Sequence, residues 1–327
     1  MFNKKNKIFI VAEIGNNHEG SYSKAKKIIN EAIKCGVDAV KFQTFEPFLY
    51  SSIHDKERYL RLKKFKLTNQ EIINLSKYCK KKNVLFFSTP FDLQSAEFLN
   101  GIQKIFKISS GDNNFYGLIE KIANFQKNII ISTGLTDDKD LKIIQKKIFN
   151  IWKNKKLTLC FLHCVTNYPT LVEDSNLNRI KELQNKFKEL VIGYSDHTIG
   201  VDCCKIAIGM GAQVIEKHFT ILKNRKRANF RDHALSANTK EMAEIVKFAR
   251  IYEKTQQTKK LNNNNEQLRR GFAVNKDLKK GYKLKIDDLI FIRPKSYFYK
   301  YNDINKLIGK KLIKNINKGQ HLDKKDI

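Results

Sequence analysis

Short apolar runs and longer stretches with helical periodicity alternate along most of the chain. Apolar runs of about four to eight residues, bounded by polar or glycine-containing segments, are typical of buried strands. When such runs alternate with helical stretches, they indicate strand–helix units and a parallel sheet. The sequence predicts eight strands, at Ile8–Glu13, Ala39–Thr44, Val84–Thr89, Ile105–Ser110, Ile129–Thr133, Leu157–Val165, Val191–Ser195 and Val214–His218.

The stretches between these strands carry the signals of amphipathic helices. Lys24–Cys35 places its isoleucines on one helical face. Thr68 and Glu71 match a capping box that opens a helix ending near Lys82, and Asn238 begins the last helix with a Glu three residues later. Further helices are expected after Thr136 and around Asn176–Phe187, whereas the charged segment from Thr44 to about Lys66 is expected to be irregular.

Eight strand–helix pairs have the rhythm of a TIM (β/α)8 barrel, whose catalytic residues lie at the C-terminal ends of the strands. A doubly wound open sheet also alternates strand and helix, but no GxGxxG motif follows the first strand. Polar residues close nearly every predicted strand, which favours a barrel in which they converge on one mouth. They are Glu13, Lys41, Gln43, Ser88, Thr89, Lys107, Ser110, Ser132, His163, Ser195, His197, Glu216 and His218.

The composition changes after the last predicted helix. Residues 255–267 are polar, Asn-rich and low in complexity, as expected of a flexible linker. We therefore expect a barrel domain over residues 1–254, a linker over 255–267 and a second module over 268–327. In this module, short apolar segments alternate with Lys-Lys-Gly and Asn-Lys-Gly turns, which predicts a small β-rich fold. A module of this size is marginally stable alone and is expected to pack against a larger surface.

The net charge of +30 suggests nucleic acid or anionic small molecules as partners. The lysines are dispersed, however, and no nucleic-acid recognition motif accompanies them, so we expect no specific nucleic acid partner. No stretch is long and apolar enough for a membrane span, and the N-terminus leaves no room for a signal peptide. The six cysteines lack the spacing of a zinc site, which favours a reduced, cytoplasmic protein.

Two predicted strands each end in a histidine. Because strand residues alternate between faces, Glu216 and His218 share one face of the last strand. The strand from Val191 closes on His197 in a similar way. Either histidine alone would be read as an ordinary core or surface residue, but the pair predicts a divalent-metal site.

Lysines are also expected inside the barrel. Lys41 and Gln43 lie two residues apart on one strand, and Lys107 lies on another. Buried lysines are costly unless a negative charge neutralises them. The hydroxyl groups of Thr89, Ser110 and Ser132 would surround a phosphate or carboxylate, which indicates a small anion with several negative charges beside the metal. Alternatively, the lysines pair with Glu13 and Glu216.

Several motifs together resemble the sialic acid synthase family, which comprises N-acetylneuraminate synthases and their pseudaminic and legionaminic acid relatives. They follow one another as AEIGNNHEG from Ala12, VKFQT from Val40, FSTPF from Phe87, FKISSG from Phe106, ISTG from Ile131, LHC from Leu162, YPT from Tyr168, GYSDHT from Gly193 and EKHFT from Glu216. The second module resembles the antifreeze-like SAF domain of the same enzymes.

The resemblance implies a transferase that condenses phosphoenolpyruvate with an N-acyl hexosamine such as N-acetylmannosamine, releasing phosphate. The product would be N-acetylneuraminate or a close relative, with pseudaminic or legionaminic acid as alternatives. His197 and His218 would hold the cofactor, a divalent metal for which Mn²⁺ is favoured over Mg²⁺ or Co²⁺. The family also implies a domain-swapped homodimer.

The resemblance further implies a role for each site residue. Glu13 and Glu216 would handle protons or orient a metal-bound water, and Arg293 would reach the acyl group of the sugar from the partner subunit. Asp112 stands where many family members have Glu. Phosphoenolpyruvate would contact Lys41, Thr89, Lys107, Ser110, Ser132 and Ser195, and the sugar would contact Gln43, Tyr168 and Asp232.

Two further departures from the family pattern lie where the acyl sugar would bind, at Asn229–Ser236 and at the residues after Pro294. They bear on the identity of the sugar and not on the reaction. Two other function classes compete with this one. The first is a non-catalytic protein that binds carbohydrate or nucleic acid, and the second is a phosphoenolpyruvate-dependent synthase that makes a shorter keto sugar acid.

Overall fold

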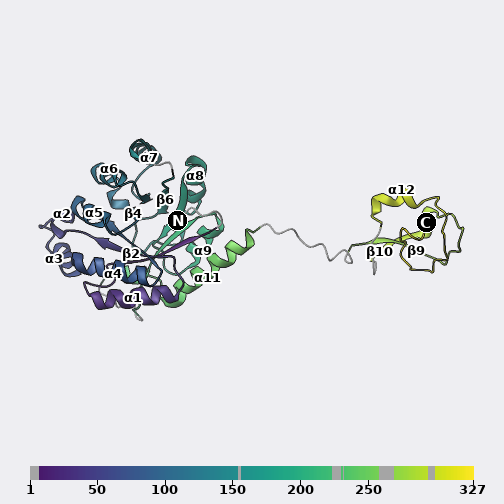
Figure 1. Cartoon of the computed structure of the whole chain (residues 1–327), viewed down its shortest axis with the longest axis horizontal. Helices are drawn as coiled ribbons and strands as arrows, with labels where there is room; N and C mark the ends of the chain where they lie inside the picture. The colour runs from purple at the N-terminus through teal and green to yellow at the C-terminus, as the bar shows by residue number, and fades with distance from the viewer. Residues whose placement is uncertain (1–6, 154–155, 223–229, 231, 258–268, 294–298) are drawn as a thin grey trace. The chain divides into compact units, whose positions relative to one another are not determined.

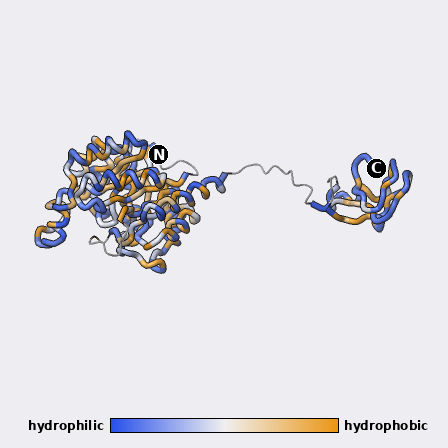
Figure 2. The backbone as a smooth tube through the Cα atoms, turned by 90° about the horizontal axis from the view of Figure 1, so that it is seen from below, coloured by the Kyte–Doolittle hydropathy of each residue, from blue (hydrophilic) through white to orange (hydrophobic). Residues whose placement is uncertain are grey.

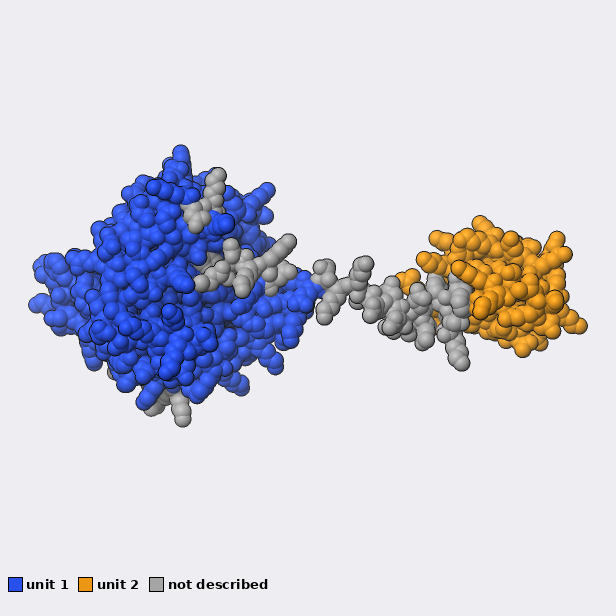
Figure 3. Space-filling view, viewed as in Figure 1, with its two compact units in different colours: residues 1–257 blue, residues 258–327 orange. Residues whose placement is uncertain are grey.

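The computed structural model describes residues 7–153, 156–222, 230, 232–257, 269–293 and 299–327. The chain divides into two compact units, residues 1–257 and residues 258–327 (Figures 1 and 3). Most of the expected linker, together with the departures at residues 229, 231 and 294–298, lies outside the described residues.

In the described part of the first unit, eight parallel strands form one sheet in the order β3-β2-β1-β8-β7-β6-β5-β4. The strands at the two ends of this order, β3 and β4, also contact each other, so the sheet is a nearly closed barrel. The expected TIM barrel is confirmed. The strands are β1 (Phe9–Gly15), β2 (Ala39–Thr44), β3 (Leu85–Pro90), β4 (Ile105–Ile108), β5 (Asn128–Ser132), β6 (Leu159–Cys164), β7 (Val191–Asp196) and β8 (Val214–His218).

Helices surround this barrel (Figure 1). Both expected capping boxes are confirmed: Thr68 and Glu71 open α4, and Asn238 and Glu241 open α11. The described helices of the first unit are α1 (Tyr22–Lys34), α2 (Pro47–Tyr50), α3 (Lys56–Phe65), α4 (Asn69–Lys81), α5 (Leu93–Asn100), α6 (Tyr116–Asn124), α7 (Asp138–Ile151), α8 (Asn178–Lys186), α9 (Asp202–Gly209), α10 (Asp232–Leu235) and α11 (Thr239–Thr255).

One expectation about these elements was wrong. The segment after β2, expected to be irregular, contains α2 and α3. The side chain of Asp55 caps the N-terminus of α3, and Leu62 and Phe65 are buried on one face. Charged residues on the remaining faces of α3 hid this periodicity, because they left only a narrow apolar stripe.

The hydrophobic core has two layers. The outer layer lies between the strands and the helices, along which hydrophobic and hydrophilic residues alternate (Figure 2). The inner layer lies inside the barrel and includes Phe9, Val11, Phe87 and Val214. Toward the C-terminal ends of the strands the interior becomes polar. There Glu13 pairs in register with Lys41 on one side and with His218 on the other.

The described residues of the second unit form a small fold with its own core. Strands β9 (Gly271–Val274) and β10 (Leu289–Ile292) pair antiparallel, and isolated bridges tie β9 and neighbouring loops to the C-terminal segment. A short helix, α12 (Ile304–Leu307), packs on them. The buried side chains include Phe272, Leu284 and Leu312. The β-rich character is confirmed, with more of the module in turns and bridges than the sequence indicated.

Candidate active site

A cavity of about 480 Å³ opens at the C-terminal ends of the barrel strands. Side chains from all eight strands or from the loops that follow them line it. Among the residues predicted for the site, those that line the cavity are Glu13, Lys41, Gln43, Thr89, Lys107, Ser110, Ser132, Tyr168, Ser195, His197, Glu216, His218 and Asp232.

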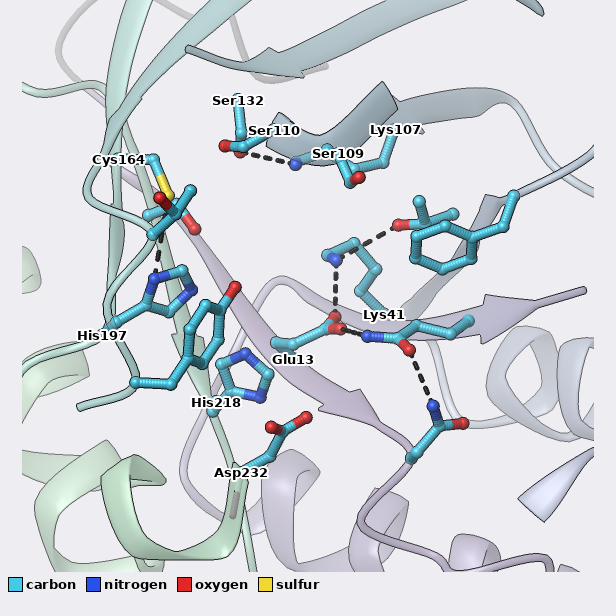
Figure 4. Close-up of a pocket in the computed structure, with 18 of the residues that line it drawn as sticks. Glu13, Lys41, Lys107, Ser109, Ser110, Ser132, Cys164, His197, His218 and Asp232 are labelled. Atoms are coloured by element: carbon cyan, nitrogen blue, oxygen red, sulfur yellow. Dashed lines mark hydrogen bonds and ion pairs between the residues drawn. The ribbon is translucent and has the colours of Figure 1, made fainter. Parts of the chain in front are cut away.

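Lys41 lies at the centre of the charged floor of the cavity (Figure 4). Its Nζ is 2.7 Å from Oε2 of Glu13, 3.6 Å from Oε2 of Glu216 and 3.3 Å from the Thr89 hydroxyl. Burial alone would lower the pKa of Lys41, but the two carboxylates more than offset this and raise it. Lys41 therefore stays protonated inside the barrel.

Lys107 brings a second positive charge from β4. Its Nζ donates to the Ser132 hydroxyl at 2.6 Å and lies 3.8 Å from Oε1 of Glu216. Burial lowers its pKa, because Glu216 compensates the charge only in part. The alternative pairing of the lysines with the glutamates is thus present in the geometry, with Glu216 shared between Lys41 and Lys107.

The two glutamates differ in their electrostatic surroundings. Burial raises the pKa of Glu13 to about 7, although Lys41 opposes the shift. Burial also acts to raise the pKa of Glu216, but Lys107 and Lys41 reverse the effect and hold it below the usual value. The Ser195 hydroxyl donates to Glu216 at 3.0 Å. Such a difference between neighbouring carboxyl groups is typical of sites that move protons.

Ser110, Ser132 and Lys107 gather at the end of the cavity opposite to Asp232, with the histidines and Glu13 between them (Figure 4). The main chain comes close here, because a Cβ at Gly134 would lie 2.9 Å from Oγ of Ser110. The glycine allows the amide of residue 134 to donate to that hydroxyl at 3.2 Å. This end of the cavity therefore presents a cation and hydroxyl groups to an anion.

The two predicted metal ligands come together. The ring centres of His197 and His218 are 5.6 Å apart, and the ring of Tyr168 lies 4.1 Å from that of His197. The Nδ1 of His197 lies 2.6 Å from the carbonyl oxygen of Val165. A carbonyl only accepts, so Nδ1 carries the proton and the lone pair of Nε2 is available to a ligand.

The donor set fits a divalent metal. Imidazoles that share one ion at about 2.0–2.1 Å from each nitrogen keep their ring centres within roughly 6–7 Å of each other, and the observed separation of 5.6 Å meets this condition. No group of three or more His, Cys, Asp or Glu side chains in metal-binding geometry occurs among the described residues. A metal held by His197 and His218 would therefore complete its coordination with water or substrate oxygen.

Two predicted residues lie elsewhere. Asp112 is not among the described residues that line the cavity, and its carboxylate instead accepts a hydrogen bond from Ser109. Arg293 follows β10 in the second unit and is exposed there. The roles expected for both residues stay predictions.

Sequence reasoning missed part of the outer wall. Tyr50, Arg58 and Arg61 line the cavity from α2 and α3, and the Arg58 guanidinium lies 5.2 Å from the centre of the Tyr50 ring. The helical spacing of Arg58, Arg61 and Leu62 behind the Asp55 cap was the signal that could have placed them together. Cys164 and Phe230 also line the cavity.

Buried lysines, glutamates and two neighbouring histidines line the C-terminal mouth of this TIM barrel. TIM-barrel enzymes carry their catalytic residues at this mouth. The model of the NeuB family matches residues 28–261, and that of the SAF domain matches residues 269–327. The chain belongs to the NeuB family of phosphoenolpyruvate-dependent nonulosonic acid synthases and carries a SAF domain.

Its relatives agree with this assignment over nearly their whole length. The chain is 35% identical to an N,N'-diacetyllegionaminic acid synthase of Campylobacter jejuni, covering 84% of this chain and 87% of the relative. A pseudaminic acid synthase of the same organism is 32% identical, with 99% and 98% covered. The crystal structure of an N-acetylneuraminic acid synthetase from Leptospira borgpetersenii matches with a TM-score of 0.71 and 33% identity, covering 78% of this chain and 87% of that one. None of the described helices has the length and apolar character of a membrane span.

Proposed function

We propose that this chain condenses phosphoenolpyruvate with an open-chain N-acyl hexosamine, giving a nine-carbon 2-keto acid and inorganic phosphate. A carbon–carbon bond forms between the phosphoenolpyruvate methylene and the sugar aldehyde, water adds at C2, and the bond from C2 to the phosphate oxygen breaks. The observation that supports this most is the cavity itself, where Lys41 and Lys107 lie beside paired imidazoles in a barrel of this family.

Phosphoenolpyruvate would bind at the end of the cavity formed by Lys107, Ser110 and Ser132, with Lys41 and Thr89 beside it. A multiply charged anion repays the cost of keeping lysines away from water. Lys41 and Lys107 are at most 4% exposed. Ser195, which hydrogen-bonds to Glu216, would add a hydroxyl contact to the same ligand.

The sugar would extend from the histidines toward Asp232, with Gln43 and Tyr168 as further contacts. The amide of Gln43 is oriented for this task, because Asn16 donates to its Oε1 at 2.8 Å and its Nε2 donates to Glu13 at 3.3 Å. Glu13 lies between the two ligands. With a pKa of about 7, its carboxyl can hold or release a proton near neutral pH.

His197 and His218 would hold the divalent metal, for which Mn²⁺ is favoured and Mg²⁺ or Co²⁺ are alternatives. Bound there, the metal would act as a Lewis acid that polarises the sugar aldehyde. Glu216 is hydrogen-bonded to Ser195 and is paired with both lysines, so it would keep the charge of the site balanced as ligands enter.

The second unit would complete the site from the partner in a domain-swapped homodimer, with Arg293 contacting the acyl group. The separate core of this unit supports the idea that it docks as one body. Asp112 would act through water, because its carboxylate is turned to Ser109.

The relatives do not single out one acceptor sugar. Identities to relatives named as legionaminic, pseudaminic and N-acetylneuraminate-9-phosphate synthases lie between 30% and 35%, too evenly to favour one sugar. The family resemblance implies an acceptor such as N-acetylmannosamine, and the product would then be N-acetylneuraminate.

The test measures phosphate release with phosphoenolpyruvate, Mn²⁺ and a panel of acceptors. The panel includes N-acetylmannosamine, its 6-phosphate and the diacetamido hexoses that lead to legionaminic and pseudaminic acids. We expect release that depends on both substrates with at least one of these sugars. Release only with shorter aldose phosphates would identify a different keto acid synthase. Sugar binding without turnover, in protein shown to be loaded with metal, would identify a binding protein.

A further inference from the structure

The two histidine-bearing strand ends are joined behind the cavity by a buried ion pair. Asp196 is the last residue of β7 and directly precedes His197. Lys217 precedes His218 on β8, and Asp196 and Lys217 pair in register. Nζ of Lys217 lies 2.6 Å from Oδ2 of Asp196, and both side chains are 0% exposed. Because strand residues alternate, this pair lies on the face opposite to the histidines. The described lining of the cavity includes neither residue.

The ion pair is anchored to the main chain of Thr198, the residue that follows His197. Oδ1 of Asp196 accepts from the amide of Thr198 at 2.9 Å and from the Tyr194 hydroxyl at 3.0 Å. Lys217 in turn donates to the carbonyl oxygen of Thr198. Thr198 is therefore linked to Asp196 of β7 through its amide and to Lys217 of β8 through its carbonyl.

Further contacts leave the pair little freedom to move. The Cys204 thiol on α9 donates to Oδ2 of Asp196 at 3.2 Å. A shift of one strand end relative to the other would therefore have to break contacts of this network.

Stability alone is a weak reason for such a pair. Buried ion pairs often add nothing to stability compared with apolar residues of the same volume, because both charges lose their hydration. On the same outward face of β8 and the residue after it, Ile215 and Phe219 are apolar and pack in the core between strands and helices. A charge pair between β7 and β8 at this position fits a role in holding the two strand ends at a fixed separation.

We propose that Asp196 and Lys217 are positioning residues, which fix the separation of the His197 and His218 imidazoles and thereby set the affinity of the site for a divalent cation. This inference rests on the proposed metal site. The affinity of that site for the metal would then depend on two residues that contact neither the metal nor the substrates.

The test compares Mn²⁺ binding to metal-free wild type, Asp196→Asn and Lys217→Met, by electron paramagnetic resonance of the free ion. Residues that orient metal ligands typically change affinity by about 10–100-fold when they are replaced, and we expect a loss in that range for each variant. Saturating Mn²⁺ should then restore much of the phosphate release. Lys217→Arg, which keeps the charge, should recover part of the affinity.

Asp38→Asn is the matched control. Asp38 also forms an ion pair between distant segments, 2.6 Å from Arg250, but it precedes β2 at the opposite end of the barrel. This variant should lose stability and keep the wild-type affinity for Mn²⁺. The comparison separates loss of position from loss of stability.

If Lys217→Met alone does not fold, the double variant Asp196→Asn/Lys217→Met leaves no unpaired charge, and its Mn²⁺ affinity decides the question. Wild-type affinity in the folded variants would overturn the positioning role and leave the proposed function intact. Wild type that binds no Mn²⁺, under conditions where it releases phosphate, would overturn the metal site and this inference together.

Discussion

Replacing Lys107 with Met should weaken phosphoenolpyruvate binding while leaving the barrel folded. Methionine keeps most of the length of the side chain but removes the charge. In the wild type this charge is buried, because Lys107 and its neighbours are shielded from water. Nζ of Lys107 already contacts Ser132 at 2.6 Å, so an anion that reached Ser132 would meet the ammonium group at hydrogen-bond distance.

The size of the effect follows from two opposing terms. A unit charge about 4 Å from an anion gains about 4 kcal/mol at an effective dielectric constant of about 20. Glu216, 3.8 Å from Lys107, already satisfies part of this charge and reduces the gain. The remainder is comparable to a hydrogen bond with a charged group, about 1.5–3 kcal/mol, which corresponds to roughly a 10- to 150-fold rise in Kd.

Isothermal titration of phosphoenolpyruvate into wild type and Lys107→Met measures this rise directly. Lys104→Met is the control, because Lys104 is an exposed lysine just before the same strand, β4, and the described lining of the cavity excludes it. Its affinity should equal that of wild type. Unchanged affinity in Lys107→Met, with its fold verified by circular dichroism, would refute the assignment of this end of the cavity to phosphoenolpyruvate.

Three further outcomes are expected. His197→Ala and His218→Ala should each abolish metal-dependent turnover in a folded barrel, and full activity with unchanged metal content would exclude the two-histidine site. Because burial raises the pKa of Glu13 from 4.5 to about 7, the folded chain keeps a proton that the unfolded chain releases. The free energy of unfolding should therefore fall between about pH 4.5 and pH 7, and urea unfolding of Glu13→Gln should lack this fall. Arg293→Ala should mainly impair use of the sugar, and mixing it with His218→Ala should restore activity if subunits exchange second units. No recovery in proven mixed dimers would contradict the exchange.

Much of the barrel could be predicted because its signal is local. The strands Ala39–Thr44 and Val214–His218 have the bounds expected from their apolar runs. Alternation along each strand then indicated which polar residues turn inward, and residues such as Lys41 and His218 do line one cavity. Such inferences need only the period of a strand and the rule that parallel strands end at the same edge.

The outer wall of the cavity could not be predicted in the same way. Tyr50, Arg58 and Arg61 reach it because α2 and α3 fold back over the end of the barrel, which depends on tertiary packing of Leu62 against Phe91 and Phe45. A helix with few apolar residues gives a weak periodic signal, and the signal does not indicate where the helix will dock. The sequence therefore predicted the part of the cavity at the strand ends more completely than the wall formed by α2 and α3.

The buried pair behind the histidines was visible in the sequence only as an anomaly. Lys217 stands between Ile215 and Phe219 on the outward face of its strand, where a barrel packs apolar residues against helices. A charge there requires an opposite charge within reach of the same strand, because isolated burial would cost several kcal/mol. The neighbouring strand has one acidic residue, Asp196, and it lies directly before the other histidine. Once the strands are aligned by their ends, this pairing follows. The two buried charges then lie directly beside the two histidines that we propose as metal ligands, where their cost in stability would be offset by a fixed separation of the imidazoles.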